Sequence, residues 1–206
     1  MSTGTVAEEL DLVRWTRRET LDLVAALSQD ELERRPAPGK WSVGEVLDHL
    51  LLSDGIYRAD IAELIARAHR GGPTELDRHF RDLDASILFI PKALLPLLEL
   101  PLLLLNPLMP RSLRDFAVRS RWVPAQNPTA TTPRPGRSGD ELRRELAASL
   151  EELAGLIAAN PDLDYRALVH RHPLLGTNDV PQLLRFVANH EARHQDQVRD
   201  TMRAVA

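Results

Sequence analysis

The stretch Trp41-Ser42-Val43-Gly44-Glu45-Val46-Leu47-Asp48-His49 carries the clearest structural signal in this chain of 206 residues. Ser42 and Glu45 have the spacing of a capping box, in which the serine hydroxyl accepts the glutamate amide hydrogen and the carboxylate accepts the serine amide hydrogen. Trp41 precedes the cap and can pack on Val46, as in a hydrophobic staple. The stretch therefore predicts the start of a long helix.

Three further segments have apolar residues at helical spacing. Helices are predicted over residues 6–27, 42–70, 138–160 and 179–205. Ser138 and Glu141 form a second candidate capping box, and Asp179 can cap the last helix. No segment shows the alternating pattern of a strand, so the sequence predicts an all-α fold, a four-helix bundle in a single domain over residues 1–206.

An insertion of about residues 71–137 separates the second and third predicted helices. It contains an apolar run, 87–109, that is long enough to suggest a membrane span. The run holds prolines at positions 91, 96, 101 and 107. Because each proline removes an amide donor that lipid cannot replace, we expect no integral span. Short helices that cover the bundle, line a ligand cleft or form a subunit contact are the alternatives.

Composition and charge exclude several classes of protein. The net charge of −4 and the pI of about 6.0 argue against a nucleic-acid partner. The absence of cysteine excludes disulfides, cysteine-based zinc sites and thiol nucleophiles. The first ten residues lack the apolar run of a signal peptide, so we expect a cytoplasmic protein.

His190 and His194 are the most informative of the seven histidines. They lie four residues apart on the apolar stripe of the last predicted helix, so both rings point into the bundle. Two buried rings need partners for their nitrogens, and a divalent metal can accept a lone pair from each. Two core histidines that bind carboxylates or carbonyls are the alternative.

A third ligand must come from another segment, and His49, beside the apolar stripe of its helix, is the best candidate. His190-Glu191-Ala192-Arg193-His194 also fits the HExxH pattern of zinc proteases, but no further histidine or glutamate follows it. We predict that His172 lies in a loop or packs without a ligand role. His69, His79 and His170 are predicted to lie on the surface.

Three blocks of the sequence resemble the DinB-like superfamily, also described as the YfiT-like metal-dependent hydrolases. The blocks are Gly39-Lys40-Trp41-Ser42 with Glu45 and His49, then His172-Pro173-Leu174-Leu175-Gly176, and finally His190-Glu191-Ala192-Arg193-His194 with Gln197. Their order and spacing bracket most of the chain. The insertion lies outside them and is longer than is usual in this family.

The resemblance implies a bundle with up-down-down-up order, often dimeric, and a divalent metal, commonly zinc or nickel. The implied ligands are His49, His190 and His194. Some members of the family are S-transferases that use mycothiol or bacillithiol. The implied function is therefore that of a hydrolase or a thiol S-transferase that acts on a small molecule.

Three neighbouring polar residues have more than one interpretation. Glu191 is the candidate catalytic residue, as a general base or an acceptor beside the metal, and is otherwise a surface residue next to Arg193. Gln197 is the candidate cofactor contact, or it fills the end of the bundle, whereas Glu45 is a cap. A different function also stays open: a non-catalytic bundle that binds a hydrophobic ligand or partner, with a structural metal or none. Peripheral membrane association through the insertion is a third hypothesis.

Overall fold

The computed structural model describes residues 4–79, 115–116, 118–119, 129–172 and 176–205. The helices are α1 (Val6–Val24), α2 (Gln29–Glu33), α3 (Val43–His69), the 3-10 turn η4 (Thr129–Thr131), α6 (Gly139–Ala158) and α7 (Val180–Val205). The strands are β1 (Glu75–Asp77), β2 (Val169–His172) and β3 (Gly176–Asp179). The predicted apolar run over 87–109 lies outside the described residues.

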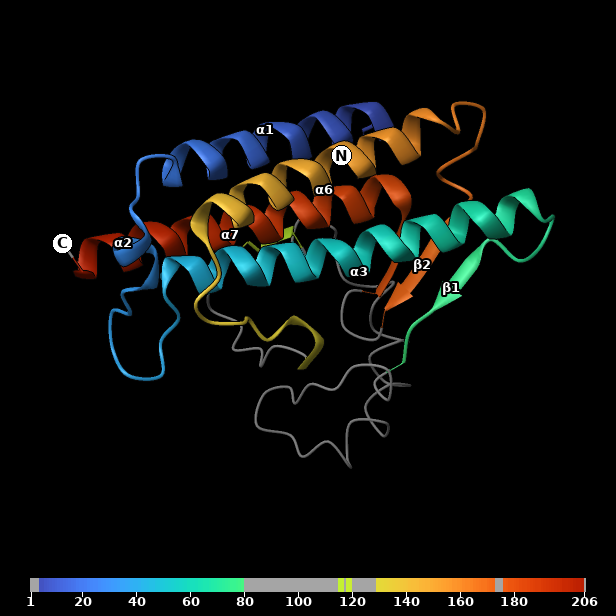
Figure 1. Ribbon diagram of the computed structural model, residues 1–206. Helices are drawn as coiled ribbons and strands as arrows, with labels where there is room; N and C mark the ends of the chain where they lie inside the picture. Colours follow the sequence, from blue (N-terminus) through green and yellow to red (C-terminus); the bar gives the residue numbers. More distant parts are fainter. Residues whose placement is uncertain (1–3, 80–114, 117, 120–128, 173–175, 206) are drawn as a thin grey trace.

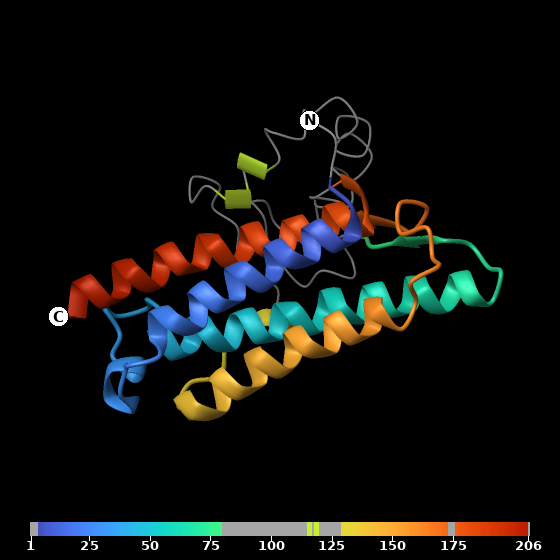
Figure 2. The same cartoon turned by 90° about the horizontal axis from the view of Figure 1, so that it is seen from above.

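The four long helices form the predicted bundle (Figure 1). α1 and α7 run in one direction, and α3 and α6 run in the opposite direction, so the order is up-down-down-up (Figures 1 and 2). α1 packs along α7, and α3 packs against both α6 and α7. This arrangement confirms the all-α fold class and places α3 beside α7.

The helix caps show which local predictions hold. Glu45 N–H donates to Ser42 Oγ at 3.2 Å and Ser42 N–H donates to Glu45 Oε2 at 2.9 Å, which confirms the first capping box. Asp179 caps α7 by accepting from the amide of Gln182 at 2.8 Å. The capping box predicted at Ser138 is wrong, because its side chain makes no cap hydrogen bond. The Gly139 amide, next in the chain, donates to the Gln29 side chain at 2.9 Å.

A three-stranded sheet lies against the C-terminal half of α3 and was not predicted. β1 pairs parallel to β2, and β2 pairs antiparallel to β3. Each strand has only three or four residues, too few for an alternating pattern to be recognised. The sheet also corrects the prediction for His170, which is only 1% exposed and binds Asp60 of α3 through Nε2 at 2.9 Å.

The hydrophobic core consists of two clusters, one in each half of the bundle. The cluster beside the sheet contains Leu10, Val13, Ile61, Leu64, Leu153, Leu183, Leu184 and Val187, among others. The cluster at the other end contains Val24, Leu32, Val43, Val46, Leu47, Leu50, Leu142, Leu146 and Val198. Along α1, α3 and α7, polar residues lie between the two clusters.

Arg17 is the centre of the buried polar layer and is 1% exposed. Its guanidinium donates to both carboxylate oxygens of Glu191, at 2.8 and 3.1 Å, and to Asp54 at 2.5 Å. It also donates to the Leu146 carbonyl at 2.5 Å. One side chain of α1 therefore binds α3, α6 and α7. The buried position of this charged group is tolerated because its donors are paired.

No helix among the described residues is long and apolar enough to cross a membrane.

We expect Arg17→Ala to lower the free energy of unfolding by about 3–5 kcal/mol, because it leaves Glu191 and Asp54 inside the bundle without their cation. Arg14→Ala is the matched control, since Arg14 forms an exposed pair with Asp11 at 2.9 Å on the same helix. Such an exposed pair contributes about 0–1 kcal/mol. Urea denaturation measures both values, and equal losses in the two variants would contradict the role of Arg17.

Candidate metal centre

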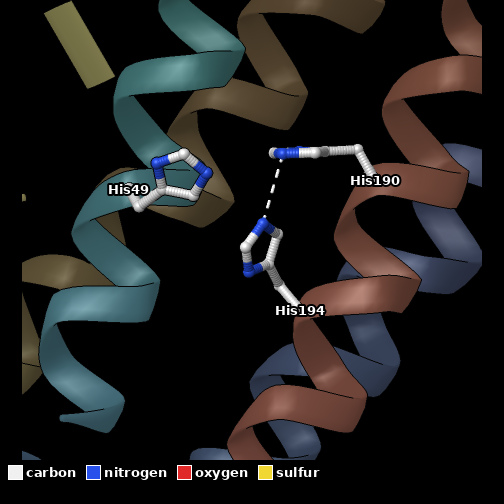
Figure 3. Close-up of side chains that lie close together, drawn as sticks. All are labelled: His49, His190 and His194. Carbon is white, nitrogen blue, oxygen red and sulfur yellow. Dashed lines mark hydrogen bonds between the residues drawn. The ribbon is translucent and has the colours of Figure 1, made fainter. Parts of the chain in front are cut away.

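α3 and α7 bring together the three histidines that the sequence singles out. His49 comes from α3, and His190 and His194 lie one turn apart on α7, with all three rings converging (Figure 3). One nitrogen from each ring lies within 4.8 Å of the others. Within the described part of the chain, this is the one group of three or more such side chains that could hold a metal ion.

His49 has a buried nitrogen that needs a partner. Its Nδ1 donates to the backbone carbonyl of Thr131 at 2.8 Å, so Nε2 carries the lone pair of the neutral ring. That Nε2 is buried and has no hydrogen-bond partner among the described residues. A histidine that donates one ring N–H to a carbonyl and offers the other nitrogen is the usual form of a metal ligand.

His194 is held in the same tautomer by its own helix. Its Nδ1 donates to Gln197 Oε1 at 2.9 Å, which leaves Nε2 as the acceptor. Nε2 of His190 lies 3.2 Å from Nε2 of His194 and donates to it. Two nitrogen ligands of a tetrahedral zinc ion lie about 3.3 Å apart, so this pair already has the required spacing. To offer Nε2 to a metal, the neutral His190 ring has to carry its proton on Nδ1 instead.

Aromatic neighbours limit how the rings can turn. Trp41 lies 5.0 Å from the His49 ring, between centroids. Phe186, one turn before His190, stacks on the His190 ring at 5.9 Å with an interplanar angle of 15°. Trp41 also packs against the core cluster that contains Val46, as the staple predicts. These contacts orient the ligands before any metal binds.

The rotation of α7 about its axis determines where its histidines point. Glu191 and Gln195, each one residue after a histidine, face α1. Gln195 Nε2 donates to the Thr16 carbonyl at 2.8 Å and to Thr20 Oγ1 at 3.0 Å, and Thr20 Oγ1 donates to Glu191 at 2.6 Å. Because successive helix residues are about 100° apart, fixing these two side chains on α1 turns the histidines toward α3.

Glu191 is 1% exposed, so the interpretation as a surface residue is wrong. Its two carboxylate oxygens accept hydrogen bonds from Arg17 and Thr20. The carboxylate does not belong to the group of ligand atoms formed by the three histidines in the described part of the chain. Glu45 is likewise engaged, as a cap that also pairs with Arg35 at 2.5 Å.

Burial favours the neutral form of two ligand rings, those of His49 and His190. It lowers the pKa of His49, and the nearby positive charge of Arg193 acts in the same direction. Burial also lowers the pKa of His190 well below its ordinary value, with further contributions from the rings of His194 and His49. A neutral ring is the form that donates a lone pair to a metal, so at neutral pH both rings have the charge state that a ligand needs.

The last residues of the insertion, 131–137, also reach the site, which the sequence did not predict. Asp48, beside His49, is fully buried and accepts from the Arg134 backbone amide at 2.7 Å and from its guanidinium at 2.7 and 3.1 Å. Arg137 donates to the same carboxylate at 3.1 Å. Burial opposes ionisation of Asp48, but these hydrogen bonds outweigh it and hold the pKa of its carboxyl below the ordinary value.

His172 lies on β2 and not in a loop, and its ring stacks on that of His170 at 6.1 Å. Burial lowers the pKa of His172 to about 3, and the neighbouring His170 adds to this effect. The pair sits beside Asp60, eleven residues along α3 from His49, and neither ring belongs to the three-histidine group. The absence of a ligand role for His172 stays a prediction.

Comparison with known proteins agrees with the sequence resemblance. Residues 12–198 match the family described as the DinB superfamily. The chain is 25% identical over 184 residues to the uncharacterized protein YuaE of Bacillus subtilis strain 168, an alignment that covers 89% of this chain and 91% of the relative. No solved structure matches the chain at a significant level.

We expect the free energy of unfolding of the metal-free protein to decrease as the pH falls below about 6.5. His49, His190 and His172 resist protonation in the folded state, whereas each binds a proton in the unfolded chain near that pH. Protonation therefore favours unfolding, by up to about 1.4 kcal/mol per pH unit for each ring.

Urea denaturation of chelator-treated protein between about pH 7.5 and about pH 5.5 measures this dependence. The change in the free energy of unfolding per pH unit should be smaller in His172→Gln by the contribution of one ring. In the wild type this ring stays neutral in the folded state, because its pKa of about 3 is far below the range tested. A stability that is independent of pH in this range would contradict the neutral state of the buried rings.

Proposed function

The chain belongs to the DinB superfamily, and we propose that it is a metal-dependent enzyme, a hydrolase or a low-molecular-weight-thiol S-transferase acting on a small molecule. One observation carries this proposal. His49 offers a buried Nε2 without a partner among the described residues, within 4.8 Å of the ring nitrogens of His190 and His194. A divalent ion, with zinc or nickel as the first candidates, is the occupant that uses all three lone pairs.

The protein residues have separate roles in this proposal. His49, His190 and His194 hold the ion, and the Thr131 carbonyl and Gln197 amide keep two of the rings in the ligand tautomer. When bound, the ion supplies Lewis acidity that makes a water or a thiol at its open positions more acidic. Trp41 and Phe186 lie against the ligand rings and restrict solvent around them.

An enzyme is favoured over a structural metal site by the number of ligands. Structural zinc sites are almost always closed by four protein ligands, whereas catalytic sites keep an open position. The described part of the chain offers three. A fourth protein ligand would instead support the alternative, a non-catalytic bundle.

Glu191 and Gln197 have positioning roles in the proposed enzyme. Glu191 pairs with Arg17 and so fixes the rotation of α7; proton transfer by its carboxylate would require these hydrogen bonds to break. Gln197 orients His194 through Oε1, and a contact of its amide with a thiol cofactor such as mycothiol or bacillithiol is part of the S-transferase hypothesis. A homodimer and a cytoplasmic location stay predictions.

We expect untagged protein to bind one transition-metal ion per chain. His49→Ala, His190→Ala and His194→Ala should each weaken zinc binding by at least about tenfold, because each removes one of three ligands. His69→Ala is the control, since His69 is an exposed histidine that binds Asn160. Elemental analysis and isothermal titration measure the content and the affinity. Equal zinc binding by the wild type and all three ligand variants would overturn the proposed function.

The two proposed reactions are separated by their co-substrate. The zinc-loaded protein is assayed for hydrolysis of small esters and amides, and for conjugation of mycothiol or bacillithiol with electrophiles. Conjugation that depends on His190 assigns the S-transferase, and thiol-independent hydrolysis that depends on His190 assigns the hydrolase. A zinc site closed by four protein ligands, with neither activity, would assign the structural alternative.

A further inference from the structure

We propose that Asp48 is a positioning residue of the metal centre, which acts through the chain segment 131–137 to hold His49 as a ligand. The inference rests on the proposed metal site. It adds that a residue outside the three ligands influences the metal affinity of that site. Asp48 touches none of the three ligand rings through a hydrogen bond. Its partners are Arg134 and Arg137, at the end of the insertion, just before α6.

The first step is the contact between this segment and α3. The Asp48 carboxylate, with 0% exposure, accepts four hydrogen bonds, including one from the Arg134 backbone amide at 2.7 Å. A backbone amide fixes the position of the main chain, whereas a guanidinium alone on a long side chain would not. The segment is therefore held on the helix turn that carries His49.

The second step is the link to α6. The guanidinium of Arg137 binds Asp48 and also contacts Glu145 at 2.7 Å and Glu141 at 2.8 Å. Only 15% of the Arg137 side chain is exposed. The segment is thus fixed at both α3 and α6, and its position is determined by charge-assisted hydrogen bonds that are stronger than neutral ones.

The same segment also contacts the ring of His49. Thr131, three residues before Arg134, places its carbonyl 2.8 Å from Nδ1 of His49. This is the described hydrogen bond that fixes the tautomer and leaves the buried Nε2 free for a metal. If the segment moves, Nδ1 loses its acceptor, and the ring can protonate Nε2 or rotate away. Such supporting contacts commonly contribute tenfold to hundredfold to metal affinity.

The test compares Asp48→Asn with Asp60→Asn. Both residues are buried carboxylates of α3 that pair with arginine, since Asp60 binds Arg78 and His170 and is 2% exposed. Asp60 lies eleven residues from His49 and has no described contact with segment 131–137. We expect Asp48→Asn to weaken zinc binding by about 10–100-fold in isothermal titration. Asp60→Asn should leave the zinc affinity unchanged.

A second readout tests the path through His49. In a His49→Ala background, Asp48→Asn should cause no further loss of zinc affinity, because the ring it positions is absent. In NMR spectra of the metal-free protein, the hydrogen-bonded Nδ1–H of His49 should give a slowly exchanging signal in wild type and Asp60→Asn, and not in Asp48→Asn. Arg134→Gln removes the side-chain bonds alone and provides a milder variant if Asp48→Asn does not fold.

Several outcomes would overturn the inference: an unchanged affinity in Asp48→Asn, an equal loss in both aspartate variants, or a further loss in the His49→Ala background. If wild type binds no zinc, the proposed function fails, and the NMR signal of His49 then decides separately whether Asp48 positions the ring. An unchanged Nδ1–H signal in Asp48→Asn would overturn the positioning role on its own.

Discussion

The buried ion pair between Arg17 and Glu191 is the interaction on which the rest of the structure depends. It joins α1 to α7 in the middle of the bundle, where both residues are only 1% exposed. Because Glu191 directly follows His190, the pair fixes the rotation of α7 and turns the histidine stripe toward α3. A leucine pair at these positions could pack as well, but it would not specify a rotation so closely, since apolar contacts have no direction.

The polar layer around this pair interrupts what could have been one continuous hydrophobic core. Buried polar groups cost free energy unless their hydrogen bonds are complete, and here Arg17, Thr20 and Gln195 all have protein partners. Within this layer the exception is Nε2 of His49, in the adjacent turn of α3; the other such atom in the described chain, Nδ1 of His170, lies at the sheet. In a layer that is otherwise satisfied, one buried lone pair without a described partner indicates a site built for an occupant, because such atoms are rare in native structures.

The sequence predicted the parts of this arrangement that depend on local spacing. The Ser42 cap, the long helices and the shared face of His190 and His194 follow from contacts within a few residues. It failed where the partner is distant. Ser138 makes no cap hydrogen bond, and the neighbouring Gly139 amide binds Gln29. His170 is buried because a short strand, paired at both edges, carries it onto Asp60. From its sequence position alone, Glu191 fits either the active site or the surface, since nothing local reveals that its partner is 174 residues away.

The prediction of His49 as the third ligand came from the family resemblance, which carries information about contacts between residues that are far apart in the sequence. The position of His49 beside an apolar stripe fits a core histidine as well as a ligand, and only the family resemblance favoured the ligand. The structure adds a physical reason, because Nδ1 is occupied by a carbonyl and Nε2 is not. That carbonyl belongs to the last residues of the long insertion, so the orientation of the ring depends on where the chain returns to the bundle. Asp48 marks this place in the sequence. It is a carboxylate in the first turns of a helix, close to the buried apolar residues Val46, Leu47 and Leu50. A buried carboxylate at such a position requires a cation from elsewhere in the fold.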